Sequence, residues 1–194
     1  PGSPQIVLEP DAALTAVVRA RLPLPARNRI RIRAVDGRSG VAELRDASAD
    51  IAVLDAFLGG RVPAELGSRE FVDELDRVLR PGGVFLANVA DGPPLTYSRR
   101  LAAAIRTALP EVLVFAEPGV LKRRRFGNVV IAASRDRLPR EAIRRSAAAA
   151  LFPRSVSTGF GRDAKPLTDA DPMRSPQPPD AIWRVGDWPD DPTP

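Results

Sequence analysis

The sequence predicts an α/β protein built on a mostly parallel sheet with helices on both faces. Two observations predict this class. From the start of the chain to about residue 133, short apolar runs typical of strands alternate with segments of helical period. Within that stretch, residues 51–54 form an uninterrupted apolar run, as expected for a central parallel strand that is buried on both faces. The 194 residues suffice for one ordinary domain with a real core.

The first half of the chain supplies three predicted strands. Residues 6–8 are apolar and stop at Glu9, and from Asp11, a suitable helix cap, the apolar residues follow the helical period. Residues 30–34 alternate apolar residues with arginine, which indicates a strand with one exposed face or a strand at an edge position. In order, the predicted elements are a strand at 6–8, a helix at 11–22, a strand at 30–34, a short helix at 41–44 and a strand at 51–54.

The second half continues the alternation. The turn at 80–83, Arg-Pro-Gly-Gly, ends one helix and precedes the next strand. The predicted elements are a helix at about 71–79, a strand at 84–89, a helix at about 101–109, and strands at 112–115 and 128–133 joined by a basic turn. The order β-α-β-α-β-α-β-α-β-β predicts a Rossmann-like sheet with helices on both faces.

The composition changes after an Ala-rich helix predicted at 140–150. We therefore expect a Rossmann-like nucleoside-binding domain, partial in this chain, at residues 1–150 and a Pro/Asp-rich C-terminal extension at 151–194. Residues after about 173 have the composition of a tail that either wraps the surface or is disordered. A wholly solvated tail seldom carries two tryptophans, so we expect at least one of Trp183 and Trp188 to dock.

Several function classes are excluded by composition. The chain has no cysteine and no histidine, which excludes disulfides, thiolate chemistry, His-based triads and His-containing zinc sites within it. No apolar run is long enough to span a bilayer and no secretory leader is present, so we expect a cytoplasmic location and no membrane partner. The positive charge behind the net charge of +5 comes mostly from arginines scattered along the chain. Only the basic residues at 122–125 form a cluster. Four basic residues in a turn favour a solvated tip over a nucleic-acid site.

Three carboxylates follow the first three predicted strands: Glu9, Asp36 and Asp55. Ligands of an open parallel sheet bind outside the carboxyl ends of its strands. An acid after the second strand of a Rossmann unit can accept the ribose hydroxyls of a nucleoside, and acids after the next two strands lie near the adenine and the reactive end. Each acid taken singly is also explained as a helix or turn cap, but three in succession favour a nucleoside site.

Six segments of the sequence resemble the spermidine synthase family, whose members have a Rossmann-like fold of the class I methyltransferase type. They are the Glu-x-Asp segment at 7–14, the Asp-Gly-Arg turn at 36–38, the catalytic-loop position at 54–57, the helix and turn at 70–71 and 79–83, and the closing segments at 126–128 and 167–172. The resemblance covers roughly residues 4–172.

The resemblance implies a role for each carboxylate. Glu9 would hold the ribose, Asp36 with Gly37 in the same turn would hold the adenine, and Asp55 would be catalytic. In the family's reaction an amine attacks the methylene carbon beside the sulfonium of decarboxylated S-adenosylmethionine. A carboxylate orients the amine and accepts its proton, because an alkylammonium cannot attack. The sulfonium is already a good leaving group, so we expect no metal.

The chain departs from the family in two places. The family's catalytic loop reads Asp-x-x-Asp-Pro, whereas Leu58 replaces the second acid here. The family's first strand and Gly-rich loop have no counterpart in this chain, which begins at the second strand. That strand would lie between the strands at 6–8 and 51–54. We therefore expect those two strands not to pair directly. Either a homo-oligomer, a strand-supplying partner chain or a separate fragment of the same parent protein fills the gap, or the sheet closes up by rearranging.

Three functions fit these residues. The first is a spermidine synthase-like aminopropyltransferase that uses decarboxylated S-adenosylmethionine and a small-molecule amine. The second is a small-molecule methyltransferase that uses S-adenosylmethionine, for which Glu9 and Asp36 serve equally well and the missing acid is not needed. The third is a non-catalytic relative that acts as a binding or interaction domain.

Overall fold

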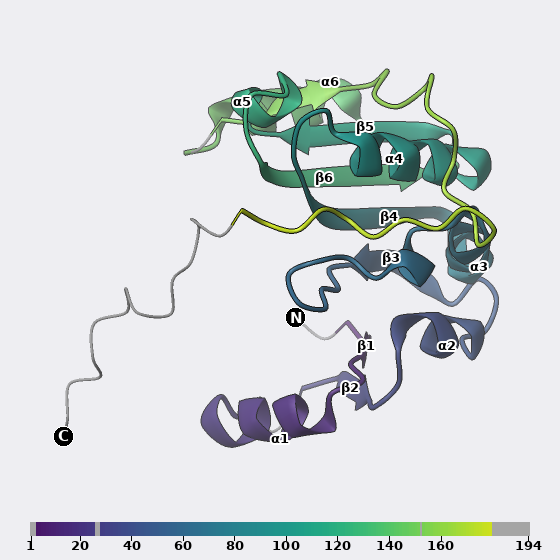
Figure 1. The fold of residues 1–194 in the computed structure, drawn as a ribbon. Helices are drawn as coiled ribbons and strands as arrows, with labels where there is room; N and C mark the ends of the chain where they lie inside the picture. Colours follow the sequence, from purple (N-terminus) through teal and green to yellow (C-terminus); the bar gives the residue numbers. More distant parts are fainter. Residues whose placement is uncertain (1–2, 26–27, 152, 180–194) are drawn as a thin grey trace, which may run out of the picture.

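Residues 3–25, 28–151 and 153–179 are described by a computed structural model of the protein. Trp183 and Trp188 lie outside these residues, so the predicted docking of the tail stays a prediction. The strands form two sheets: a two-stranded sheet at the N-terminus and a five-stranded sheet that carries the core. Figure 1 shows β1, β2 and α1 below β3, apart from the stack of β3, β4, β6 and β5.

The small sheet pairs β1 (Gln5–Leu8) with β2 (Ile30–Arg33) in parallel, from Gln5 opposite Ile30 to Leu8 opposite Arg33. Helix α1 (Ala12–Arg21) joins them. The predicted cap is confirmed, because Asp11 accepts a hydrogen bond from the Leu14 N–H at 2.8 Å. No residue of α1 is buried, although its sequence has an apolar face.

The large sheet has the order β3-β4-β6-β5-β7. Strands β3, β4 and β5 run in one direction, and β6 and β7 run in the opposite one. Its strands are β3 (Ala49–Leu54), β4 (Leu79–Asp91), β5 (Glu111–Ala116), β6 (Gly127–Ser134) and β7 (Ser155–Ser157). The connecting helices are α2 (Gly37–Ala42), the 3₁₀ turn η1 (Ala64–Leu66), α3 (Arg69–Val78), α4 (Thr96–Ala108), α5 (Pro118–Leu121) and α6 (Arg140–Ala149).

The core lies between this sheet and helices α3 and α4. Alternate residues of β4, namely Phe85, Ala87 and Val89, are almost fully buried on the helix-covered face. Helix α3 contributes Phe71, Val72, Leu75 and Val78, and α4 contributes Leu101 and Ile105, among others. Burial of these apolar side chains is the main force that holds the helices on the sheet.

The opposite face of the large sheet is covered only in part. Helix α6 and the residues before it lie over one end and leave a groove of roughly 680 Å³. The groove is lined mainly by apolar side chains, including Val84, Leu86, Phe115, Val130 and Ile143. Further along the same face, Ile51 and Val53 of β3 are 61% and 64% exposed.

The predicted fold class is confirmed: the structure is α/β, with a mixed sheet and helices on both of its faces. The predicted gap is also present. Among the described residues β1 pairs only with β2 and β3 pairs only with β4, so the strands at Ile6 and Ile51 are not joined.

The structure shifts some predicted boundaries and adds short elements. The helix expected at 41–44 begins at Gly37, because Asp36 caps it. The short helix α5 occupies part of the link between β5 and β6, just before the basic turn. Strand β7 was not predicted, since three residues within a segment without periodicity carry no strand signal.

Candidate functional site

Glu9 directly follows β1. Its backbone N–H donates to the Arg33 carbonyl oxygen at 3.0 Å, which continues the pairing of β1 with β2 by one residue. Its Oε1 accepts a hydrogen bond from the Asp11 N–H at 2.8 Å. The side chain is half-buried at the end of the strand, where the prediction placed it.

Asp36 caps α2 three residues after the end of β2. Its Oδ1 accepts from the Ser39 N–H at 2.9 Å, and this hydrogen bond holds the pKa of the Asp36 carboxyl below its usual value. The carboxylate is therefore ionised at neutral pH while it remains exposed to solvent. Gly37 lies against Leu66: a Cβ at Gly37 would be 3.3 Å from the Leu66 Cδ2. The turn thus brings the backbone close to η1.

These two acids share one edge of the small sheet. Strands β1 and β2 are parallel neighbours, so their carboxyl ends lie side by side. Helix α2 packs onto the end of β1, since a Cβ at Gly40 would meet the Leu8 side chain at 2.7 Å. The missing side chain of Gly40 leaves room for Leu8, and this packing keeps the Asp36 turn beside the strand that carries Glu9.

Asp55 follows β3, on the large sheet, and is exposed. Its Oδ1 accepts a hydrogen bond from Asn88 Nδ2 at 2.9 Å. The loop after it closes on itself: Leu58 and Arg61 exchange two backbone hydrogen bonds, of 2.8 and 3.3 Å. The turn between them uses Gly59 and Gly60 at positive φ. Leu58, at the position of the family's second acid, is 71% exposed.

Two polar residues of β4, Asn88 and Asp91, were not singled out from the sequence. Asn88 interrupts an apolar run, and its Oδ1 is buried without a hydrogen-bond partner among the described residues. It also lines the groove on the open face of the sheet. The only sequence signal for Asn88 was its polar side chain within an otherwise apolar strand.

Asp91 ends β4 and is almost fully buried. Its Oδ2 accepts from the Ser98 N–H at 2.8 Å and from the Ser98 hydroxyl at 2.7 Å, and its Oδ1 accepts from the Gly92 N–H. The Ser98 N–H belongs to the first turn of α4 and has no partner within the helix, so Asp91 satisfies it and has a structural role. Burial raises the pKa of the neighbouring Tyr97 well above its usual value, and the Tyr97 hydroxyl has no partner among the described residues.

The structure therefore brings Glu9 and Asp36 together on one sheet and places Asp55 on the other. Helix α2 connects the two sheets: it follows β2 of the small sheet, and it contacts η1 and α3 beside the large sheet. Arg77 of α3 also donates to the carbonyl oxygens of Val41 and Ala42 at the end of α2, at 3.3 Å each. Across the described ranges no group of His, Cys, Asp and Glu side chains is arranged to hold a metal ion. In the same ranges no helix is both long and apolar enough to cross a bilayer.

Comparison with known structures places this arrangement in a spermidine synthase-like fold. A probable spermidine synthase from Corynebacterium glutamicum is 28% identical to this chain, with a TM-score of 0.76, over 84% of this chain and 63% of that one. A spermidine synthase solved with the transition-state analogue AdoDATO is 16% identical, with a TM-score of 0.57, over 85% and 55% of the two chains. Human methyltransferase-like protein 13, solved with SAH, is 19% identical with a TM-score of 0.52, over 69% and 61%.

The chain thus spans less than two thirds of the length of each of these structures. No protein-family model and no curated protein sequence matches it. The likeness is one of fold, and two of these three structures were solved with a ligand, AdoDATO in one and SAH in the other.

Proposed function

We propose that this chain is the nucleoside- and amine-binding part of a spermidine synthase-like aminopropyltransferase. The observation that carries the proposal is that three carboxylates follow successive strands of a spermidine synthase-like fold: Glu9 and Asp55 directly, and Asp36 three residues after the end of β2. The substrates would be decarboxylated S-adenosylmethionine and a small-molecule amine.

In this proposal Glu9 and Asp36 bind the nucleoside. Both lie at the carboxyl edge of the parallel β1–β2 pair, where such sheets bind ligands. Glu9 Oε2 makes no hydrogen bond to the described part of the chain, so it is available to accept a ribose hydroxyl. Asp36 is exposed and ionised, which suits it to accept from the adenine amino group. Gly37, in the same turn, keeps the backbone close to Leu66 of η1.

Asp55 would orient the amine and accept its proton. The amine nitrogen forms a bond to the methylene carbon beside the sulfonium, the carbon–sulfur bond breaks, and its electron pair stays on sulfur, which leaves as neutral methylthioadenosine. The proton released from the amine passes to the Asp55 carboxylate. The bond from Asn88 Nδ2 fixes Asp55 Oδ1, so Oδ2 is the oxygen left to receive that proton.

The methyltransferase alternative is favoured by one observation. Leu58 stands where the family has its second acid, so the Asp55 loop carries one carboxylate instead of two and attracts a dication less strongly. The fold likeness to methyltransferase-like protein 13 is compatible with this alternative. A methyl acceptor of lower charge would not need the second acid.

We also infer that a strand fills the space between β1 and β3, supplied by another segment of the same parent protein, by a second copy or by a partner chain. Neither strand has a partner on its inner edge among the described residues. Beside this space Ile6 is 49% exposed, and Ile51 and Val53 are more exposed still. An open edge with apolar side chains pairs readily with another strand.

Calorimetric titration of the protein, with every segment that its gene encodes, tests the proposed function. The ligands are S-adenosylmethionine, its decarboxylated form and methylthioadenosine. Tighter binding of the decarboxylated form supports aminopropyl transfer, and tighter binding of the carboxylated form supports methyl transfer. Absence of binding by all three would contradict both and favour the non-catalytic function.

A further inference from the structure

Residues 165–178, here named the C-terminal strap, run from the start of α3 across the large sheet (Figure 1). The strap is fixed to the body of the protein. Leu167 is buried in the core, and its carbonyl oxygen accepts from the Arg69 N–H at 2.9 Å. Asp171 accepts from Arg100 of α4 at 2.7 Å. These contacts make the strap a defined element, although its sequence has no periodicity.

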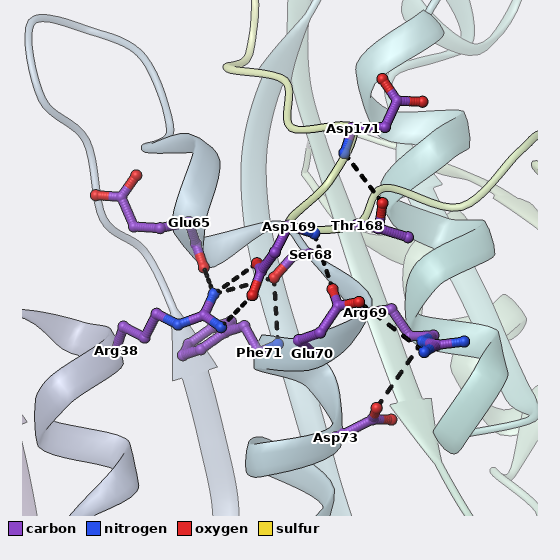
Figure 2. A network of polar contacts seen from close by, with 10 residues as sticks. All are labelled: Arg38, Glu65, Ser68, Arg69, Glu70, Phe71, Asp73, Thr168, Asp169 and Asp171. Carbon is purple, nitrogen blue, oxygen red and sulfur yellow. Dashed lines mark hydrogen bonds and ion pairs between the residues drawn. The ribbon is translucent and has the colours of Figure 1, made fainter.

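One part of the strap holds the turn that carries Asp36. The Arg38 guanidinium donates to both carboxylate oxygens of Asp169, at 2.9 and 2.5 Å. The same group donates to the Glu65 carbonyl oxygen at 3.0 Å and to the Ser68 hydroxyl at 3.1 Å (Figure 2). Arg38 lies in the first turn of α2, two residues after its cap Asp36. The planar guanidinium of Arg38 thus anchors the first turn of α2 through several hydrogen bonds.

Asp169 is itself held in place. Its backbone N–H donates to Glu70 Oε2 at 2.9 Å, and Figure 2 shows this bond beside the Arg38 pair. The Arg38 guanidinium holds the pKa of the Asp169 carboxyl below its usual value, so the pair is ionised at neutral pH. The strap therefore presents a fixed carboxylate to α2.

Another part of the strap holds the loop that carries Asp55. The Ser175 hydroxyl accepts from the Val62 N–H at 2.8 Å, and the Ser175 carbonyl oxygen accepts from Arg61 Nε at 2.6 Å. Ser175 and Val62 are completely buried. Pro178 lies against the turn, since a Cβ at Gly60 would be 3.2 Å from the Pro178 Cγ.

We infer that the C-terminal strap is a positioning element that sets the Asp36 turn relative to the Asp55 loop, through Asp169 and Arg38 at one point and Ser175 at another. The inference rests on the proposed roles of Asp36 and Asp55. No strand pairing joins the two sheets in the described residues, so their relative placement depends on side-chain contacts. Arg77 fixes the end of α2, and the Arg38–Asp169 pair fixes its start.

Hydrogen exchange by mass spectrometry tests the strap without reference to activity. Asp169→Asn should speed exchange in residues 37–42, and Ser175→Ala should speed it in residues 57–62, relative to the unmodified protein. Asp163→Asn is the matched control: Asp163 pairs with Arg99 at 2.5 Å in an exposed ion pair outside the strap, and exchange in both segments should be unchanged. Unchanged exchange in the two strap variants would overturn the inference.

Ligand binding then separates positioning from general stabilisation. Asp169→Asn should weaken methylthioadenosine binding by about two- to fivefold, as expected when a partly exposed ion pair is lost. In an Asp36→Asn background the same substitution should have little further effect, because it acts through Asp36. Equal, additive losses in both backgrounds would contradict a positioning role. Arg38→Lys should weaken binding in the same way, since an ammonium cannot replace the bidentate pair.

The two proposals fail in distinguishable ways. If the unmodified protein binds no adenosyl ligand, the proposed function is wrong, while the exchange measurement still decides the role of the strap. If Asp169→Asn fails to fold, Asp169→Glu keeps the charge and shifts only the geometry of the pair. Exchange in residues 37–42 that matches the unmodified protein in Asp169→Glu and Arg38→Lys would again overturn the inference.

Discussion

Asn88 of β4 donates a hydrogen bond to Asp55 at the end of β3, across 2.9 Å between Nδ2 and Oδ1. The two residues lie on neighbouring parallel strands, where Leu54 is opposite Ala87. This bond leaves Asp55 with one oxygen fixed and its side chain exposed to solvent. An acid that must meet an amine in a set direction gains from such a restraint.

Asn88→Ala should therefore lower kcat by about tenfold and leave nucleoside affinity unchanged, because the restraint on Asp55 is lost but Glu9 and Asp36 are untouched. Steady-state kinetics and calorimetry measure the two quantities. Asn128→Ala is the matched control, since Asn128 lines the same groove from β6. If nucleoside affinity in Asn88→Ala fell as much as kcat, Asn88 would not act on the amine through Asp55, and the prediction would be wrong.

Glu9→Gln should weaken binding of methylthioadenosine by about 1.5–3 kcal/mol, the range for hydrogen bonds to a charged acceptor. The geometry of the strand end should persist, because the amide oxygen of Gln can still accept from the Asp11 N–H. Isothermal titration calorimetry checks the prediction. Equal affinity of the two proteins would show that Glu9 does not bind the ribose.

The Arg38–Asp169 pair predicts a loss of stability in acid. The folded-state pKa of Asp169 is lowered by Arg38, so the pair contributes fully above the unfolded-state pKa of about 3.9 and its contribution is lost as pH falls below that value. Both side chains are partly exposed, which limits the contribution at neutral pH to about 0.5–1 kcal/mol.

Urea unfolding between pH 7 and pH 3 measures this effect. Asp169→Asn should be less stable than the unmodified protein at pH 7, and the difference should shrink toward pH 3. Asp50→Asn, which removes the more exposed Arg80–Asp50 pair, serves as the comparison. If the difference in free energy of unfolding between Asp169→Asn and the unmodified protein grew as the pH fell, it would contradict the prediction.

The strand ends were predictable from the sequence, because an apolar run followed at once by an acid is a local pattern. This pattern located Glu9, Asp36 and Asp55, although the role of Asp36 as the cap of α2 was not predicted. The same pattern was present at Asp91 and was overlooked. The gap between β1 and β3 followed from the resemblance to the family, whose first strand has no counterpart in this chain.

The strap could not be predicted in this way. Arg38 and Asp169 are 131 residues apart, and Ser175 and Val62 are 113 apart. A segment fixed by single side chains to distant partners needs no periodicity of its own, so its sequence shows no pattern beyond frequent proline and aspartate. Asn88 was missed for a related reason, because its partner Asp55 comes from another strand.

The most direct test of the central claim is product formation by the protein and its Asp55→Asn variant. Decarboxylated S-adenosylmethionine and a diamine are incubated with each protein, and mass spectrometry measures methylthioadenosine and the aminopropylated amine. The unmodified protein should release the two products in equal amounts. Asp55→Asn should bind methylthioadenosine with nearly unchanged affinity and form neither product. Turnover retained within a few-fold in Asp55→Asn, or no methylthioadenosine from the unmodified protein, would contradict the proposed aminopropyl transfer.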